Sequence, residues 1–326
     1  MTKLVTIFGG SGFVGRYAAR RLAKDGWRIR IAVRRPNEAL FLKPYGAVGQ
    51  VEPVFCNIRD DASVRAAMVG ASAVVNCVGV LSPSGKNGFD AVQAEGAGRI
   101  ARLAAEMGVA RLVHISALGA DAASGSTYAR SKAEGERQVQ AAFPAAVILR
   151  PSVVFGAEDR FFNRFAAMAR TSPILPVIHG DTKFQPVYVD DVARAVVAGV
   201  DGAAAGIYEL GGPEVRTFRA LMRDMLGVIL RRRKIVDVPL VVARVMACGF
   251  DGLSKVTGGL FANPAATRDQ LKLLAKNNVV SPDARGFAEL GIAPLAFESV
   301  LPEYLWPYRP DGQYARQHEI KTLPKV

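Results

Sequence analysis

The stretch LVTIFGGSGFVG at residues 4–15 constrains the fold most strongly, because an apolar strand leads directly into a glycine-rich turn. The first five residues are apolar or β-branched, which is typical of a strand covered on both faces. Three glycines at intervals of three allow a tight turn, close approach of the backbone to a pyrophosphate, and packing of the next helix on the strand. The helix predicted over residues 13–25 would direct its N-terminal amides at that pyrophosphate. The residues expected to hold a dinucleotide here are Gly9, Ser11, Gly12, Phe13, Val14 and Gly15.

Strand and helix patterns alternate through the first half of the chain, which predicts an α/β fold with a doubly wound parallel Rossmann sheet. Further strands are expected over residues 28–33, 51–57, 73–80, 111–116 and 147–154. A chain of 326 residues can bury a large core and form one large domain plus a smaller one. We expect a Rossmann domain over residues 1–160, rejoined by about 184–205, and a smaller C-terminal α/β domain over residues 161–326.

Two arginines follow the second predicted strand and bear on which dinucleotide is bound. A site selective for NAD places an acidic residue near this strand end to bind the ribose 2′-hydroxyl, whereas arginine suits the 2′-phosphate of NADP. Arg34 and Arg35 therefore favour NADPH. The alternative is a solvated arginine pair at a strand end.

Ligands of open α/β sheets gather at the carboxyl ends of the strands. Ser116 ends the fifth predicted strand and is therefore placed for function. A side chain at the position of Gly79 would crowd a cofactor that lies across the strand ends. The strand-end residues expected to border the cofactor are Asn57, Ile58, Val78, Gly79, Pro151 and Val153.

Tyr128 and Lys132, in STYARSKAEGE, are four residues apart and so lie on one face of a predicted helix. A neighbouring ammonium group would bias the phenol toward ionisation, so that it could act as an acid or base on a carbonyl or alcohol. The lysine could also reach the nicotinamide ribose. Together with Ser116 they are the candidate catalytic residues. The alternative is a purely structural pair on a helix face.

The net charge of +13 favours an anionic partner or surface. Residues 216–276 hold twelve Lys or Arg and four Asp or Glu. Basic amphipathic helices predicted over residues 218–230 and 240–250 flank the run Arg-Arg-Arg-Lys at residues 231–234. We expect the chain after about residue 218, including its aromatic tail, to dock on anionic lipid headgroups. The alternative is an ordinary solvated basic face.

Other patterns exclude several classes of partner. The chain shows no helix-turn-helix, zinc-finger spacing or stacking platform, which argues against nucleic acid. No run of about 18 apolar residues is present, so we expect no transmembrane segment.

Metal-ligand spacing is absent from the cysteines and histidines of the chain. There are three of each, and they include Cys248 and His318. We expect reduced thiols, no metal site, and His114 in the core. Residues 289–317 are rich in proline and aromatic residues without a regular period.

The GGSGFVG turn, Ser116, the Tyr128 and Lys132 pair and FQPVYVDDVARAV together resemble the extended, atypical branch of the short-chain dehydrogenase/reductase superfamily. Over the whole chain, HISALGADAASGSTYARSKAEGE, TRDQLKLLAKNNVVS and LGIAPLAFESVLPEYLWPYRPDGQY resemble the nucleotide-binding accessory subunits of respiratory complex I (NADH:ubiquinone oxidoreductase), in the form found in bacteria related to mitochondria. This resemblance implies a tightly held, mainly structural NADPH. It also implies that other complex I subunits are partners, and that the protein is peripheral on the cytoplasmic face of the bacterial inner membrane, where the two arms meet.

The chain departs from the superfamily at two positions. Gln93 stands where an asparagine usually orders a proton-relay water, and Asn57 stands where many extended members have aspartate beside the adenine. The first departure weakens the case for turnover, although the three candidate catalytic residues remain. Two functions therefore stay open. One is an accessory subunit that holds NADPH, and the other is a free NADP-dependent reductase or epimerase of an apolar carbonyl compound, such as a quinone or lipid-linked substrate.

Overall fold

The structure is a computed structural model that describes residues 3–81, 85, 87–239 and 268–314. The chain divides into two compact units. The first unit comprises Met1–Pro151, Val189–Leu210 and Val280–Ala293, and the second comprises Ser152–Tyr188, Gly211–Val279 and Pro294–Val326. The first division lies at residue 151 rather than at 160. The first unit also includes a third segment, Val280–Ala293, which the sequence pattern did not indicate.

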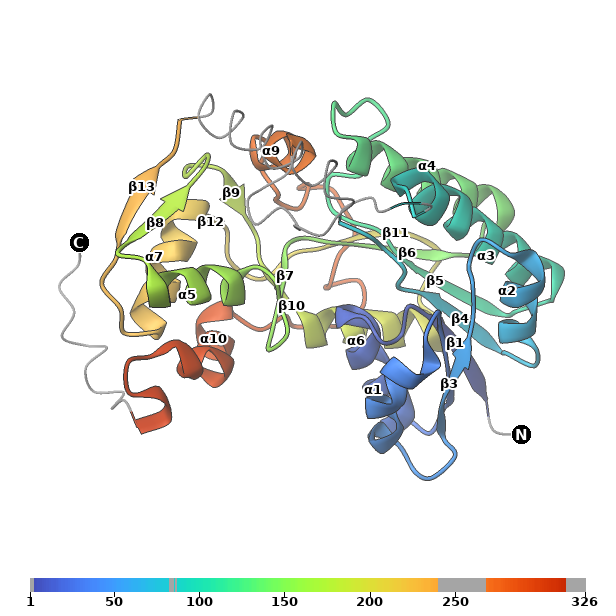
Figure 1. Cartoon of the computed structure of the whole chain (residues 1–326). Coiled ribbons are helices and arrows are strands. Elements are labelled where there is room, and N and C mark those ends of the chain that lie inside the picture. Colours follow the sequence, from blue (N-terminus) through green and yellow to red (C-terminus); the bar gives the residue numbers. More distant parts are fainter. Residues whose placement is uncertain (1–2, 82–84, 86, 240–267, 315–326) are drawn as a thin grey trace. The chain divides into compact units, whose positions relative to one another are not determined.

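The first unit contains a seven-stranded parallel sheet, which confirms the predicted fold class (Figure 1). The strand order is β11-β6-β5-β4-β1-β2-β3, so the direction of winding reverses between β1 and β4. The strands are β1 (Leu4–Phe8), β2 (Arg28–Val33), β3 (Val51–Phe55), β4 (Ala73–Asn76), β5 (Arg111–Ile115), β6 (Val147–Pro151) and β11 (Gly206–Leu210).

Helices cover both faces of this sheet, with α1 and α6 on one face and α2, α3 and α4 on the other (Figure 1). Both faces of β1 are buried: Val5, Ile7 and Phe8 have no exposed surface. The helical segments are α1 (Phe13–Lys24), η1 (Pro36–Tyr45, a 3-10 helix), α2 (Asp61–Met68), η2 (Asp90–Ala94, a π-helix), α3 (Glu95–Glu106), α4 (Thr127–Ala142) and α6 (Val189–Asp201). Double coverage of this kind explains the continuous apolar runs of the strands.

Two strands are shorter than expected. The strand predicted over residues 73–80 ends at Asn76, whose side-chain oxygen accepts from the amide of Val78 at 3.0 Å. This side-chain bond replaces the next ladder bond, so the chain leaves the sheet. The strand predicted over residues 147–154 is divided into β6 and a separate two-residue strand of the second unit, β7 (Val154–Phe155).

The second unit is built from short strand pairs and helices around a cluster of phenylalanines that includes Phe155, Phe162 and Phe218. Its strand pairs are β7 with β10 (Val187–Tyr188), β8 (Ile174–Val177) with β13 (Lys234–Asp237), and β9 (Lys183–Phe184) with β12 (Arg216–Thr217). Its helices are α5 (Phe162–Thr171), α7 (Phe218–Val228), α9 (Arg268–Leu274) and α10 (Phe297–Leu305), followed by the 3-10 turns η3 (Trp306–Tyr308) and η4 (Gly312–Tyr314).

Two expectations for this unit were wrong. Residues 297–305 form a helix although the tail was expected to lack a period, because Phe297, Val300 and Leu301 recur at helical spacing and are buried. Residues 174–177 form a strand where prolines predicted a connection. Pro176 is tolerated there because, in the part of the chain that the structure describes, β8 pairs with β13 alone and is an edge strand.

Some predictions fall outside the described residues: the helix over residues 240–250, Cys248 and His318. Within the described ranges, no helix is long and apolar enough to span a bilayer. The same ranges contain no group of three His, Cys, Asp or Glu side chains that could hold a metal ion.

Close packing of α4 on η2 depends on Gly135, because a Cβ there would lie 2.1 Å from the backbone oxygen of Gln93. We expect Gly135→Ala to lower the free energy of unfolding by about 1–3 kcal/mol, as overpacking does. The matched control is Gly227→Ala in α7, where a Cβ meets no atom of the described residues within 4 Å. The control should be neutral or stabilising by about 1 kcal/mol through helix propensity. Urea denaturation of both variants checks this, and equal midpoints would contradict it.

Candidate functional site

The glycine turn after β1 has the geometry that a pyrophosphate site requires. Gly9 has φ +71°, and a Cβ there would lie 3.1 Å from backbone atoms of Cys77 and Val78. A Cβ on Gly15 would lie 2.6 Å from the carbonyl oxygen of Gly9. Gly12 is the N-cap of α1 and supplies no side-chain cap, and the first turn has no acidic residue. The amides at this helix end are thus available to an anion, so the turn fits the diphosphate of a dinucleotide.

Arg16, in the first turn of α1, was missed by the sequence analysis. Its guanidinium donates to the carbonyls of Ser11 at 3.2 Å and Gly12 at 3.4 Å, and lies 5.0 Å from the ring centre of Phe41. The signal was an arginine directly after the third glycine. Arg16 therefore fixes a positive charge beside the turn and joins it to η1.

The structure places an acidic residue, Glu38, beside the arginines that follow β2. Arg34 is exposed after the end of β2, and Arg35 Nη1 donates to Glu38 Oε1 at 2.8 Å. The 3-10 helix η1, which was not predicted, brings Glu38 there. Both partners are exposed, so this pair contributes about 0–1 kcal/mol and can exchange readily.

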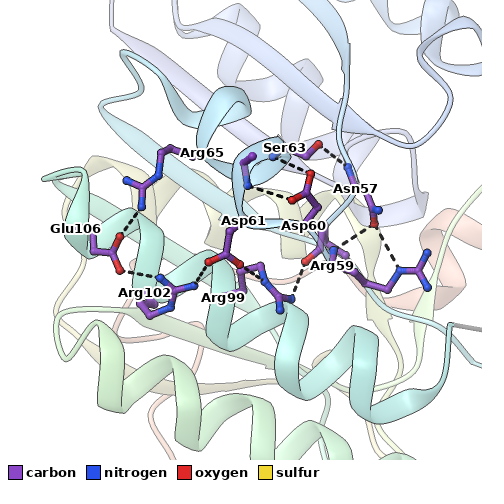
Figure 2. A network of polar contacts seen from close by, with 11 residues as sticks. Asn57, Arg59, Asp60, Asp61, Ser63, Arg65, Arg99, Arg102 and Glu106 are labelled. Atoms are coloured by element: carbon purple, nitrogen blue, oxygen red, sulfur yellow. Dashed lines mark hydrogen bonds and ion pairs between the residues drawn. The ribbon is translucent and has the colours of Figure 1, made fainter.

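Asn57 and Ile58 lie in the turn after β3, where Figure 2 shows a network of polar contacts. The amide of Asn57 donates to Ser63 Oγ at 2.9 Å, and its side-chain oxygen accepts from the amide of Arg59 at 3.2 Å. Arg99 Nη1 donates to the carbonyl of Ile58 at 3.0 Å. The members that extend this network along α2 and α3 are Asp60, Asp61, Arg65, Arg102 and Glu106. The turn is therefore held from two helices.

The end of β4 is ordered by a buried pair of side chains. Asn76 Nδ2 lies 3.1 Å from His114 Nδ1, while Asn76 Oδ1 holds the amide of Val78. Burial, with the nearby charge of Lys132, lowers the pKa of His114 to about 3. The ring is thus neutral and only 1% exposed, which confirms it as a core residue.

Ser116 does not present a free hydroxyl. It donates to the carboxylate of Glu136, which is buried in α4 and accepts from Arg150 Nε at 2.9 Å and Nη2 at 2.6 Å. A hydroxyl has a single proton to donate, and this one is committed to the ion pair. Glu136 and Arg150 were missed, although Glu136 follows Lys132 by four residues and therefore shares its helix face.

Lys132 and Gly79 lie close together. Lys132 Nζ donates to the carbonyl of Ile115 at 3.2 Å, and lies 3.5 Å from where a Cβ on Gly79 would stand. Burial lowers the pKa of Lys132 to about 8, although the carboxylate of Glu136 opposes this. The ammonium group is therefore buried beside the ends of β4 and β5.

Tyr128 differs from its expected electrostatics. Burial raises the pKa of its phenol to about 12, so the predicted bias toward ionisation by Lys132 was wrong. Its ring packs edge-on against Phe89, with 5.8 Å between the ring centres. At neutral pH the phenol is protonated, so it can donate a hydrogen bond but is not poised as a base.

Three further residues complete the comparison with the predicted site. Gln93, in η2, donates to the carbonyl of Val80 at 2.7 Å, and its buried Oε1 has no partner within the described part of the chain. The carbonyl of Pro151 accepts from Leu118 at 2.9 Å, beside the end of β5. Val153 belongs to the second unit, where its amide lies 3.2 Å from Asn278 Oδ1.

The lowered pKa of Lys132 gives a test of the buried site. The folded pKa of about 8 lies below the ordinary value near 10.4, so the unfolded chain binds more protons between these values. The free energy of unfolding therefore rises with pH between these two pKa values. Lys132→Met removes this pH-dependent contribution. We expect the difference in unfolding free energy between wild type and Lys132→Met to change from pH 8 to pH 10. The control Lys183→Met alters an exposed lysine and should show a constant difference. A constant difference for both variants would contradict the burial.

Comparison with known proteins agrees with this geometry. The model of the NAD dependent epimerase/dehydratase family matches residues 5–211. The chain is 36% identical over 316 residues to a protein of Arabidopsis thaliana named NADH dehydrogenase (ubiquinone) 1 alpha subcomplex subunit 9, mitochondrial, an alignment that covers 95% of this chain and 79% of that one. It is 32% identical over 240 residues to the ceramide reductase of Caulobacter vibrioides, covering 72% and 74% of the two chains.

Among solved structures, the Bordetella bronchiseptica enzyme WbmH in complex with NAD+ superposes with a TM-score of 0.69 at 17% identity, covering 96% of this chain and 100% of that one. This similarity shows the shared fold. The resemblance inferred from the sequence motifs is confirmed, since the family model spans the glycine turn, Tyr128 and Lys132. The chain belongs to the NAD dependent epimerase/dehydratase family, and its relatives include subunits of mitochondrial NADH dehydrogenase.

Proposed function

We propose that the protein is an NADP(H)-binding accessory subunit of respiratory complex I, in which the cofactor is mainly structural. The observation that carries this proposal is the similarity to the Arabidopsis subunit over 95% of the chain, which includes the second unit. Two features of the site support a structural cofactor. The hydroxyl of Ser116 is committed to Glu136, and the phenol of Tyr128 has a raised pKa. A group that gives up its proton reluctantly suits binding of the ribose better than rapid proton transfer.

The preference for NADP(H) over NAD(H) follows from the charges after β2. Arg34 and Arg35 would meet the 2′-phosphate, with Arg16 adding positive charge near the turn. The phosphate would replace Glu38 as the partner of Arg35, because breaking this exposed ion pair costs little free energy. A guanidinium and a phosphate form charge-assisted bonds that are stronger than bonds to a neutral hydroxyl.

The double variant Arg34→Ala and Arg35→Ala should weaken NADPH binding by about 10-fold to 100-fold, since a bond to a charged group contributes about 1.5–3 kcal/mol. NADH binding should change by less than about three-fold, because NADH lacks the phosphate. The matched control is Arg28→Ala, an exposed arginine at the opposite end of β2. Fluorescence titration of both nucleotides measures this. Equal losses for NADPH and NADH would contradict the assignment.

We also propose that the second unit docks at the cytoplasmic face of the bacterial inner membrane, against anionic lipid headgroups and neighbouring subunits. Arg231 and Arg233 already donate to the carbonyls of Tyr308 and Ala169, each at 2.7 Å, so they hold the unit together. Arg232 and Lys234 are exposed and available to a lipid phosphate. A basic residue near an anionic membrane contributes about 1 kcal/mol. The exposed aromatic side chains available to an interface are those of Trp306 and Tyr314.

Native purification from membranes in mild detergent tests the assignment. We expect the subunit to co-migrate with a large NADH-oxidising complex and to carry NADPH. The double variant Arg232→Glu and Lys234→Glu should leave the membrane at a lower salt concentration than the wild type does. Salt screening and charge reversal weaken the same contacts with the lipid phosphates. The control reverses Arg160 and Arg170, which are exposed in the same unit. A free species that never co-migrates would overturn the subunit assignment, and unchanged salt release would overturn only the electrostatic docking.

The similarity to the Caulobacter ceramide reductase favours a second candidate function, a free NADP-dependent reductase of a lipid-linked carbonyl compound. The discriminating residue is Tyr128. In a reductase, Tyr128→Phe would lower turnover by about 10²-fold to 10⁴-fold, as loss of an acid-base group does. In the accessory subunit, the same variant leaves cofactor retention and NADH oxidation by the complex nearly intact.

A further inference from the structure

The large apolar side chains that are exposed in the described residues are unevenly distributed. Eleven such side chains have substantial exposure, and four of them fall within residues 40–55. We name these four the edge patch: Leu40 at 48% exposure, Phe41 at 43%, Val48 at 108% and Phe55 at 64%. Single exposed apolar residues are normal on a protein surface, whereas a local group of them marks an interaction site.

The sheet geometry places the edge patch on one side of the sheet. Among the described residues β3 pairs with β2 alone, so it is an edge strand of the sheet. Val54 packs against the cluster that contains residues of α2 and α3. Because successive side chains of a strand point to opposite faces, Phe55 points to the other face. The segment η1, which carries Leu40 and Phe41, contacts β3 and α1, and Val48 lies in the short link between η1 and β3.

The free edge of β3 is poorly suited to pairing with another strand. The amide of Cys56 donates inward to the carbonyl of Val33 at 2.9 Å. By alternation, the backbone nitrogen of Pro53 faces outward, and proline has no proton to donate. An outward proline interrupts the donors of an edge strand and so prevents strand addition. A partner must therefore bind this edge through side chains, which the exposed apolar groups of the edge patch provide.

The charges around the edge patch are mainly positive. Residues 34–48, which follow β2 and carry three of the four patch residues, hold three Lys or Arg and one Glu. Arg34 is exposed after the end of β2, and Lys43 is exposed on η1. The patch contains none of the tryptophan or tyrosine side chains that gather at membrane interfaces. An apolar centre with a charged rim is the arrangement of a protein interface, and this rim is complementary to carboxylates.

We propose that the edge patch is the docking surface for a neighbouring protein subunit that presents an apolar surface ringed by Asp and Glu side chains. This inference rests on the proposed function as a subunit of complex I. It assigns the first unit a contact of its own, in addition to the lipid contact of the second unit. Arg34 lies at the rim, so the cofactor phosphate and the partner's carboxylates would share one region of positive charge.

The test uses the full chain expressed in its own host, where the complex can form. The variant combines Leu40→Ser, Val48→Ser and Phe55→Ser, and leaves Phe41 in place because its ring contacts Arg16. The control is Val69→Ser, an apolar side chain with 59% exposure that directly follows α2. We expect the triple variant to be recovered in the purified complex at less than one tenth of the wild-type level, with the control unchanged. The isolated triple variant should keep its unfolding midpoint and its NADPH affinity.

The outcomes separate this inference from the function on which it rests. Normal recovery of the triple variant in the complex overturns the edge patch as a docking surface. A loss of NADPH affinity in the isolated variant also overturns it, because the patch would then cover the cofactor. If wild-type protein binds vesicles that contain phosphatidylglycerol and the triple variant does not, the edge patch contacts the membrane, and the inferred protein partner is overturned. If wild-type protein itself fails to co-purify with the complex, the proposed function fails, and the inferred partner fails with it.

Discussion

The buried ion pair of Glu136 and Arg150 is the interaction on which the candidate site depends, because it fixes α4 against β6. Arg150 lies in β6, and Ser116 at the end of β5 donates to the same carboxylate. The helix so held also carries Tyr128 and Lys132. Removing one member of a buried pair leaves an uncompensated charge, at a cost of about 3–5 kcal/mol. The residues that would contact a nicotinamide are thus positioned by a charge pair that need not contact it.

Glycine residues, which have no side chain, allow the close packing in the rest of the site. Helix α1 packs against the turn because nothing larger than hydrogen fits at Gly15. Gly96 leaves space in α3 for the side chain of Ile58, and Gly135 lets α4 approach the backbone of Gln93. These contacts let α1 pack on the turn after β1, α3 on the turn after β3, and α4 on η2. Protein interiors are close-packed, so an added methyl group at Gly15 or Gly135 must displace backbone, whereas one at Gly96 must displace the side chain of Ile58.

The sequence was sufficient to predict the parts of the structure that depend on local pattern. The glycine turn and the parallel sheet follow from spacing along the chain and from the alternation of strand and helix patterns. The 3-10 helix that brings Glu38 to Arg35 has no strong period, so its acidic residue was overlooked. The pKa of Tyr128 depends on burial, which only the folded chain defines, and this effect outweighed the expected influence of the lysine.

The chain crosses between its two units five times, and this has a consequence for how the protein is made. On a ribosome the first 151 residues emerge as an incomplete sheet, since β11 arrives only with residues 206–210. Glu209 in that strand meets Arg150 early, but its other partner, the amide of Ser281, is synthesised about seventy residues later. The first unit therefore reaches its complete set of contacts only when most of the polypeptide has been translated. A prematurely terminated product would expose the open edge of β6 or β11, so chaperones and proteases can recognise it.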